Sequence, residues 1–298
     1  MAGSSFTNSI KTTDVITVLY MVITAMYMLV FGGLSELFVI PMLIRLLVVL
    51  FVWAVIYLQR TWNNNWINFI HLFYPILMLS YFYGETALIN HIIFSNNLDP
   101  IIYNWEEALF GFQPSLEFSI KFPQYWFSEI LHFGYFSYYL LTFGISLIFF
   151  IYKPDMVEKV IFLVITFLFI NYLVFIVFPV VGPQYYFSPP FSEVADSGVF
   201  SRAVKLVQFY GEHPTGAFPS SHVGLVVIFL YISYCNIRWL FWVIIPLFIL
   251  ILFATVYIKA HYVVDVFAGI ISAPIVYYFS LILFKQINFK LSNFSNIV

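Results

Sequence analysis

Two short segments of this 298-residue chain carry side chains suited to acid, base and nucleophilic chemistry. The first, GAFPSSHVG at 216–224, places Ser220, Ser221 and His222 directly after a proline. Proline suits the first turn of a helix and an apolar run follows, so we expect these residues at a helix N-terminus. Free backbone N–H groups and the helix dipole make such an end an anion site. Ser220 would add a hydroxyl donor, and His222 an acid able to protonate a leaving oxygen.

The second segment, AHYVVDVFAG at 260–269, contains His261 and Asp265. Their spacing at the start of a predicted helix puts both side chains on one face, where the carboxylate can accept a proton from one ring nitrogen. The other nitrogen is then free to act as a nucleophile. The alternative is a plain serine cap and two structural histidines. An aspartate beginning a membrane helix argues against it, because such a charge is costly without a function.

The elements that position these residues are membrane helices. The chain is 62% hydrophobic and only 9% charged, outside the range of soluble domains. Its net charge of −2 provides no basic field for nucleic acid. A spanning helix needs about 20 apolar residues. Eight segments meet this need: 14–32, 37–58, 66–83, 128–152, 158–179, 219–236, 238–258 and 262–284.

We therefore expect an all-α, polytopic membrane protein, with two N-terminal helices in residues 1–65 and a six-helix catalytic core in residues 66–298. Lys and Arg in the connections favour cytoplasmic termini, seven against four. Both histidine segments then open to the extracytoplasmic side, as expected for an enzyme of a bacterial inner membrane. The polar, aromatic connection 84–127 predicts amphipathic helices along the interface. They would serve as a scaffold or lid, or contact substrate through Glu106, Glu107 or Lys121.

These residues resemble the type 2 phosphatidic acid phosphatase superfamily, over roughly residues 66–284. Members carry a Pro-Ser-Gly-His motif and a later Ser-Arg-x5-His-x3-Asp motif. The matching positions here are Pro219, Ser220 and His222, followed by His261 and Asp265. The resemblance implies that His261 attacks phosphorus to give a phosphohistidine, that Asp265 orients it, and that His222 protonates the leaving group. It also implies catalysis without a metal or other cofactor.

Three cationic positions of that family are missing. Ala254 and Thr255 stand where Ser-Arg is expected, and Phe175 and Gly182 stand where an earlier Lys-x6-Arg-Pro motif aligns. The run ATVYIKAHYVVD at 254–265 is instead similar to the inositol phosphorylceramide synthase branch. Other side chains must then hold the phosphate. Two candidates are the cations Lys205 and Lys259, which could also be solvated headgroup contacts. The other candidates are Gln184, Tyr257 and His213.

The expected substrate is a phospholipid or other lipid phosphate, since the catalytic groups lie at headgroup depth. Water as acceptor gives a lipid phosphate phosphatase. A lipid hydroxyl gives an inositol phosphorylceramide synthase-like phosphotransferase, whose singly charged diester donor suits the loss of cations. Two other classes are a zinc site formed by three histidines with Asp265 and a transporter using Arg45 and His71. The zinc site is disfavoured because orienting His261 already explains the presence of Asp265. The transporter is disfavoured because it would carry more ionisable groups at mid-membrane. No protein partner is predicted.

Overall fold

The structure, a computed structural model, describes residues 9–62, 64–189 and 198–295, and within these ranges it contains helices and no strand. Seven helical segments in this part are long and apolar enough to cross a bilayer. The predicted span at 219–236 forms α10, Ser221–Asn236, whose 16 residues fall short of the usual length. The all-helical prediction is confirmed, and an eighth span stays a prediction. The seven segments are Thr12–Gly32, Glu36–Trp62, Asn65–Ile89, Tyr125–Tyr152, Pro154–Val177, Arg238–Tyr257 and Val263–Asn293.

The chain forms two compact units. The first consists of Met1–Tyr81, Ser146–Phe169 and Tyr277–Val298, and the second of Phe82–Ile145 and Ile170–Val276. All predicted site residues belong to the second unit, while a domain boundary at residue 65 stays a prediction. Several long helices begin in one unit and end in the other: α3 (Asn65–Ile89), α6 (Tyr125–Tyr152), α7 (Val157–Val177) and α12 (Val263–Ser295).

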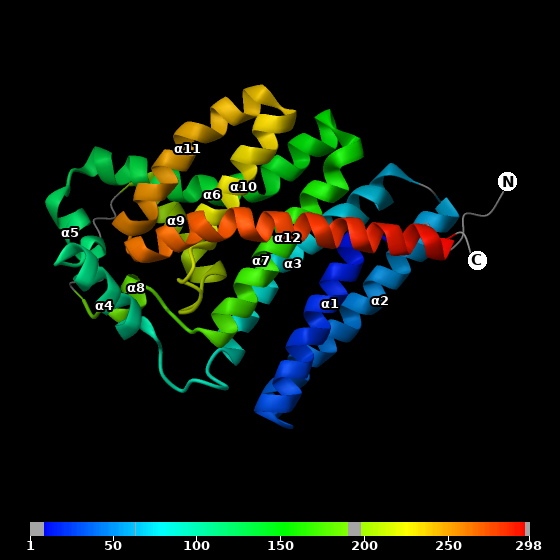
Figure 1. Ribbon diagram of the computed structural model, residues 1–298, viewed down its shortest axis with the longest axis horizontal. Coiled ribbons are helices and arrows are strands. Elements are labelled where there is room, and N and C mark those ends of the chain that lie inside the picture. Colours follow the sequence, from blue (N-terminus) through cyan, green and yellow to red (C-terminus); the bar gives the residue numbers. More distant parts are fainter. Residues whose placement is uncertain (1–8, 63, 190–197, 296–298) are drawn as a thin grey trace. The chain divides into compact units, whose positions relative to one another are not determined.

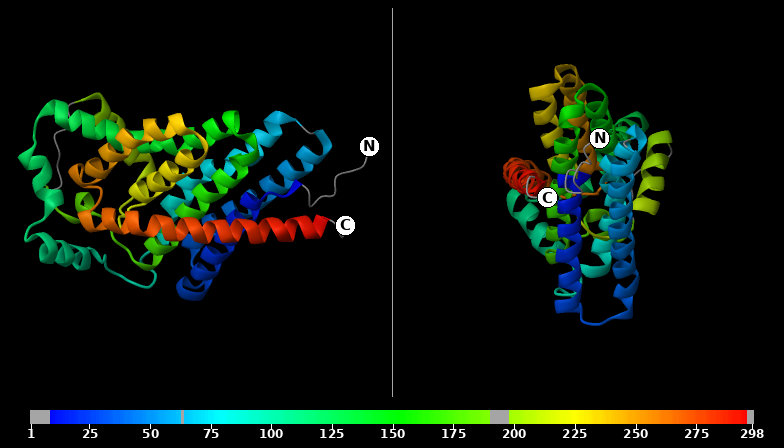
Figure 2. Two further views of the ribbon diagram at one scale, coloured as in Figure 1. Left: turned by 45° about the horizontal axis from the view of Figure 1, so that its top comes forward. Right: turned by 90° about the vertical axis from the view of Figure 1, so that its right-hand side faces the viewer.

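In the first unit, α1 (Thr12–Tyr27) and α2 (Val39–Trp62) lie side by side (Figures 1 and 2). Asp14 and Arg45, two buried polar residues of these helices, have partners inside the unit. The carboxylate of Asp14 lies 2.9 Å from His71 Nε2 and accepts a hydrogen bond from a tyrosine hydroxyl. Arg45 donates to the carbonyl of Met21 at 3.1 Å. Buried polar groups require hydrogen bonds of this kind. Arg45 and His71, the two residues of the transporter alternative, therefore have a structural role that needs no transport path.

The α-helices not yet named lie wholly in the second unit. The apolar helices α10 and α11 (Arg238–Tyr257) pack closely as a hairpin, with the turn at Ile237, between the predicted segments 219–236 and 238–258 (Figure 1). The connection 84–127 forms α4 and α5, and a later connection forms α8 and α9. The bounds of these four helices are Asp99–Phe110, Pro114–Lys121, Pro183–Tyr186 and Val199–Gly211.

Helix α4 is amphipathic, as the sequence predicts. Pro100 lies in its first turn, and Gly111 ends it with a left-handed φ of 72°. Trp105 and Leu109 are exposed, whereas the acidic residues Asp99 and Glu106 are buried. This distribution leaves an apolar side for the membrane interface and turns two carboxylates into the protein.

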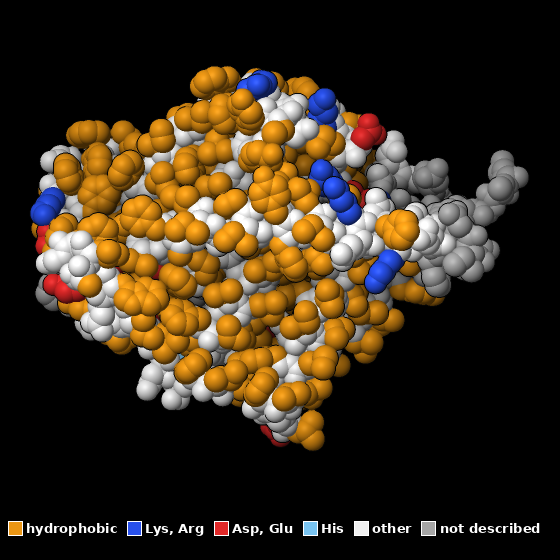
Figure 3. Space-filling view, in the orientation of Figure 1, with side chains coloured by type: hydrophobic (Ala, Val, Ile, Leu, Met, Phe, Trp, Pro, Cys, Tyr) orange, Lys and Arg blue, Asp and Glu red, His pale blue; other side chains and the backbone are white. Residues whose placement is uncertain are grey.

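The surface of the membrane helices is apolar. Hydrophobic side chains dominate the face drawn in Figure 3, where charged side chains are few and scattered. Helix α12 contributes an exposed stripe of large apolar residues at intervals of three or four positions. So much exposed apolar area is unfavourable in water, and seven apolar helices fit an integral membrane protein. The stripe consists of Phe267, Ile271, Ile275, Phe279 and Ile282.

Candidate active site

His261 lies in the tight turn between α11 and α12. Lys259 in this turn has a left-handed φ of 65°, and the backbone N–H of His261 donates to the carbonyl of Thr255 at 3.0 Å. Helix α12 begins at Val263, two residues after His261. The expectation that His261 belongs to the helix was therefore wrong. The positive φ of Lys259 reverses the chain, and this reversal sets the histidine ahead of the first helical turn.

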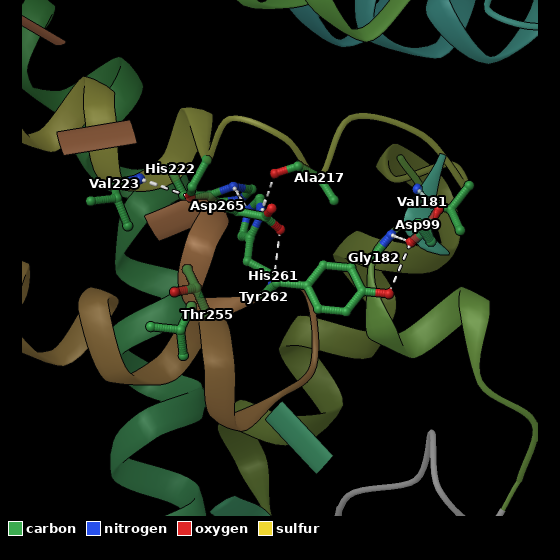
Figure 4. Close-up of polar contacts among 12 residues, drawn as sticks. Asp99, Val181, Gly182, Ala217, His222, Val223, Thr255, His261, Tyr262 and Asp265 are labelled. Atoms are coloured by element: carbon green, nitrogen blue, oxygen red, sulfur yellow. Dashed lines mark hydrogen bonds and ion pairs between the residues drawn. The ribbon is translucent and has the colours of Figure 1, made fainter. Parts of the chain in front are cut away.

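The two ring nitrogens of His261 have different neighbours (Figure 4). Nδ1 lies 2.7 Å from the carbonyl oxygen of Ala217, and Nε2 lies 3.2 Å from Nδ1 of His222. A carbonyl oxygen only accepts hydrogen bonds, so Nδ1 of His261 carries the proton and Nε2 keeps its lone pair. The lone pair is then aimed at the second histidine, whose Nδ1–H donates to it.

Asp265 lies close to His261 but does not take its proton. Its Oδ2 is 3.6 Å from Nδ1 of His261, beyond hydrogen-bond range. The same oxygen instead accepts the backbone N–H of Tyr262 at 2.8 Å. This is the arrangement of a side chain in the first helical turn that reaches back to the N-cap. The Ala217 carbonyl thus takes the place expected for Asp265, and a role of Asp265 in orienting His261 stays a prediction.

The environment of His261 keeps its ring neutral. Burial lowers the pKa of His261 to about 4, although the hydrogen bond to Ala217 and the charge of Glu212 oppose that shift. At neutral pH the imidazole is therefore uncharged. A neutral ring with one nitrogen already hydrogen-bonded presents the other as a nucleophile.

His222 is surrounded by tyrosines from α6. The rings of Tyr135 and Tyr138 have centroids 4.8 and 4.1 Å from that of His222. The hydroxyls of Tyr135 and Tyr139 both donate to the carboxylate of Glu212. The sequence analysis missed this group. The spacing of tyrosines over about one turn of a single helix, and an acid next to His213, were the available signals.

Ser220 joins the two helix N-termini at the site. It is the N-cap of α10, where its hydroxyl accepts the N–H of Val223 at 3.4 Å, so the predicted helix start is confirmed. Its own N–H donates to the carbonyl of Asp265 at 2.9 Å. A Cβ added to Gly269 would lie 2.5 Å from the Ser220 carbonyl oxygen. Only glycine therefore lets α12 approach the start of α10 this closely.

This contact yields a prediction for Gly269→Ala. The added methyl must push the two helix starts apart, and such overpacking typically costs about 1 to 3 kcal/mol. We expect a lower thermal unfolding midpoint in detergent and a loss of phosphoryl transfer. Gly144→Ala is the matched control, because nothing lies within 4 Å of a Cβ at that position in α6. Equal midpoints and activities of the two variants would contradict the close approach.

The other predicted contacts are placed as follows. Ser221 is buried and hydrogen-bonds with Tyr138. Lys259 is only 1% exposed, not a cation on an open face, because the turn folds it inward. Tyr257 donates its hydroxyl to the carbonyl of Phe122. The remaining three residues have different neighbours. Gln184 accepts from the side chain of Gln208, and His213 lies against Gly84. The exposed Lys205 lies near His132.

The histidines do not assemble a metal site in the described ranges. Within them, no three His, Cys, Asp or Glu side chains gather closely enough to hold a metal ion. His213 packs beside Gly84, and the short contact of His261 is with His222 alone among the histidines. The zinc alternative therefore lacks its ligand set in this part of the chain.

Two buried carboxylates of α4 bind backbone N–H groups next to the site. Asp99 accepts from Val181 and Gly182 at 2.9 and 3.0 Å, and from the hydroxyl of Tyr262 at 3.1 Å (Figure 4). Glu106 accepts from the N–H of Val263. Burial raises the pKa of Asp99, and it raises the pKa of Glu106 from 4.5 to about 7. The contacts of Glu106 are with the backbone at the start of α12.

The raised pKa of Glu106 predicts a pH-dependent stability. The folded state holds the Glu106 proton more tightly than the unfolded state, so this stabilisation is complete below pH 4.5 and is lost as pH rises through about 7. The full change is up to about 3 kcal/mol. Glu106→Gln cannot ionise yet still accepts the N–H of Val263. We expect its unfolding midpoint to rise relative to wild type between pH 5 and 8, and Glu107→Gln to follow wild type. Parallel curves for all three proteins would refute the shift.

The fold and site together define an all-helical membrane protein in which two histidines meet at the starts of two helices. Residues 101–279 match the PAP2 superfamily, and this match covers more than half of the chain. The chain therefore belongs to the PAP2 superfamily. Members of this superfamily are phosphatases and phosphotransferases, which supports an enzyme of phosphoryl transfer. Neither a curated protein nor a solved structure matches the chain significantly.

Proposed function

We propose that the protein is a lipid phosphate phosphatase that works through a phosphohistidine at His261. One observation carries the proposal: Nδ1 of His261 is bound to the carbonyl of Ala217, and its Nε2 faces His222 at 3.2 Å. A nucleophile and an acid in hydrogen-bond reach, with the nucleophile oriented by a third group, is the arrangement that covalent catalysis needs. Membership of the PAP2 superfamily supports the same chemistry.

The reaction would proceed in two steps. Nε2 of His261 attacks phosphorus, the P–N bond forms and the bond to the lipid oxygen breaks. A His222 imidazolium gives one proton to that oxygen and becomes neutral. Water then attacks phosphorus, the P–N bond breaks, and His222 takes a proton from the water. Because phosphorus must stand between the rings, arrival of the substrate has to open the 3.2 Å contact.

The surroundings of His222 support its role as the acid. Burial and the neighbouring His261 disfavour a charged ring. The electron-rich faces of Tyr135 and Tyr138 favour it, as does the Glu212 carboxylate that binds the Tyr135 hydroxyl. A bound phosphate adds further negative charge. Together these groups supply the imidazolium at the moment when the leaving oxygen needs a proton.

A lipid substrate is supported by the position of the site. His222 lies in the first turn of the apolar helix α10, and His261 lies just before the apolar helix α12. The acidic residues of the amphipathic helix α4 bind Tyr262 and Val263, next to His261. A phosphate held there would lie near headgroup depth, with its acyl chains along the exposed apolar helix faces. In this proposal the site opens on the extracytoplasmic side of a bacterial inner membrane.

A second candidate is an inositol phosphorylceramide synthase-like phosphotransferase, which would use a lipid hydroxyl in place of water. The observation in its favour is the charge at the site. Ala254 and Thr255 replace a serine and an arginine of the superfamily and are buried, while Glu212 adds a negative charge. A phosphodiester carries one charge and a monoester nearly two. The diester would therefore meet less repulsion from Glu212.

The test is a turnover assay in lipid micelles with wild type and His261→Ala. The donors are phosphatidic acid, a prenyl diphosphate, and phosphatidylinositol with and without ceramide. Release of inorganic phosphate that depends on His261 supports the phosphatase. A phosphosphingolipid formed only with ceramide supports the phosphotransferase, and absence of any His261-dependent product contradicts both.

A further inference from the structure

The pair of carboxylates on α4 is the strongest feature that the proposed reaction does not use directly. Asp99 and Glu106 are seven positions apart, about two helical turns, so they lie on the same side of α4. Neither is accessible to solvent. Acidic side chains are almost never fully buried unless they are paired. Here their partners are backbone N–H groups on both sides of His261's turn.

Asp99 holds the segment that in turn orients His261. Its carboxylate accepts the N–H groups of Val181 and Gly182. The neighbouring carbonyl of Val180 accepts the N–H of Ala217 at 2.9 Å, and the carbonyl of Ala217 accepts the proton of His261 Nδ1. This series of hydrogen bonds leads from α4 to the ring of His261 without a break.

Gly182 makes that segment fit. Its φ is +87°, and an added Cβ would lie 2.5 Å from the carbonyl oxygen of Ala260. The N–H of Gln184 donates to the carbonyl of Lys259 at 2.8 Å. The segment that Asp99 binds is therefore packed directly against the turn that carries His261.

Glu106 holds the other side of the turn. It accepts the N–H of Val263, the first residue of α12, whereas the preceding N–H of Tyr262 goes to Asp265. Free N–H groups at a helix start need acceptors. The hydroxyl of Tyr262 also donates to Asp99. Both carboxylates of α4 thus contact residues within two positions of His261.

We propose that Asp99 and Glu106 are positioning residues that fix His261 for attack on phosphorus. This inference rests on the proposed function. Neither residue touches His261 directly. They act through the backbone of 180–182, Ala217 and Val263, and through the hydroxyl of Tyr262. Misplacement of a reacting group by about 1 Å can lower a rate by about 100-fold. Their loss should therefore lower kcat and leave KM nearly unchanged.

The test compares Glu106→Ala and Asp99→Asn with Glu107→Ala. Glu107 is the adjacent residue, and its possible substrate contact is not part of the proposed site: its side chain is exposed, and its carboxylate accepts from Gln113. For both site variants we expect kcat to fall by about 10- to 100-fold, with KM within a few-fold of wild type and with Glu107→Ala unchanged. Glu106→Gln keeps an acceptor for Val263 and should recover most of the lost kcat. Tyr262→Phe, which removes one donor from Asp99, should have a small effect of the same kind.

Amide hydrogen exchange gives a readout that needs no substrate. Peptides covering 179–184 and 259–266 should exchange faster in Glu106→Ala and Asp99→Asn than in wild type or Glu107→Ala. If Glu106→Ala does not fold, the kcat and exchange of Glu106→Gln and Tyr262→Phe decide. The inference is overturned by a raised KM with normal kcat, by Glu106→Gln being as slow as Glu106→Ala, or by unchanged exchange. A wild type without His261-dependent turnover contradicts the proposed function instead, and the exchange data still stand.

Discussion

His261→Ala is expected to lower turnover of the lipid phosphate by roughly a million-fold, the scale on which loss of a covalent nucleophile acts. The variant should also form no phosphorylated protein. The reason is that Nδ1 of His261 donates its proton to Ala217, which leaves the Nε2 lone pair facing the other histidine, where the phosphorus would bind. The measurement is a rapid quench with a radiolabelled donor. The label on wild type should be stable in base and lost in acid, as a phosphohistidine is.

The control for this experiment is His91→Ala. His91 is an exposed histidine of the same unit, and its ring contacts Asn97 at 2.8 Å. Its activity and labelling should equal those of wild type. Labelling that persists in His261→Ala would assign the nucleophile to another residue and would remove the basis of the proposed mechanism.

His222→Ala is expected to be slower by roughly 10² to 10⁴-fold on a lipid ester, whose alkoxide leaving group needs a proton. The loss should be much smaller in the first step with p-nitrophenyl phosphate, because a phenolate leaves without one. Water in the second step still needs a base. The variant should therefore accumulate label on His261, in contrast to His261→Ala. Stopped-flow release of p-nitrophenolate, together with the amount of trapped label, measures both steps.

Tyr135→Phe separates the role of His222 from that of its surroundings. Phenylalanine keeps an aromatic ring next to His222 but removes one of the hydroxyls that donate to Glu212. It should retain more activity than His222→Ala and should not accumulate label. An equal loss with both donors in His222→Ala would argue against proton transfer to the leaving group.

Much of the fold could be predicted because membrane helices follow from the length of apolar runs. The seven spans match predicted segments, and the turn near Ile237 follows from a short polar break. The sixth predicted span did not reach the usual length, because α10 starts only after its N-cap at Ser220. The predicted span was measured by hydropathy alone, whereas the capping serine sets where the helix begins.

The site could be predicted in part. Two motifs were enough to indicate His222, His261 and a helix start at Ser220, since local sequence controls caps and helix starts. The acceptor of the His261 proton could not be foreseen, because Ala217 is 44 positions away and contributes a backbone carbonyl. Glu212 also depends on tertiary contacts, since its partners come from α6. Every residue has a backbone carbonyl, so the residue types do not indicate which carbonyl will accept a hydrogen bond.

The length of α12 has a consequence for anyone who wishes to shorten this protein. Its 33 residues extend about 50 Å, well beyond the hydrocarbon thickness of about 30 Å. Its first half belongs to the unit with the histidines, and its second half, from Tyr277, packs in the unit that contains α1 and α2, where Phe284 contacts Phe162. A minimal fragment cut to the superfamily match at 101–279 would leave this helix truncated and without its packing partners. The smallest fragment worth purifying therefore keeps α1, α2 and the whole of α12.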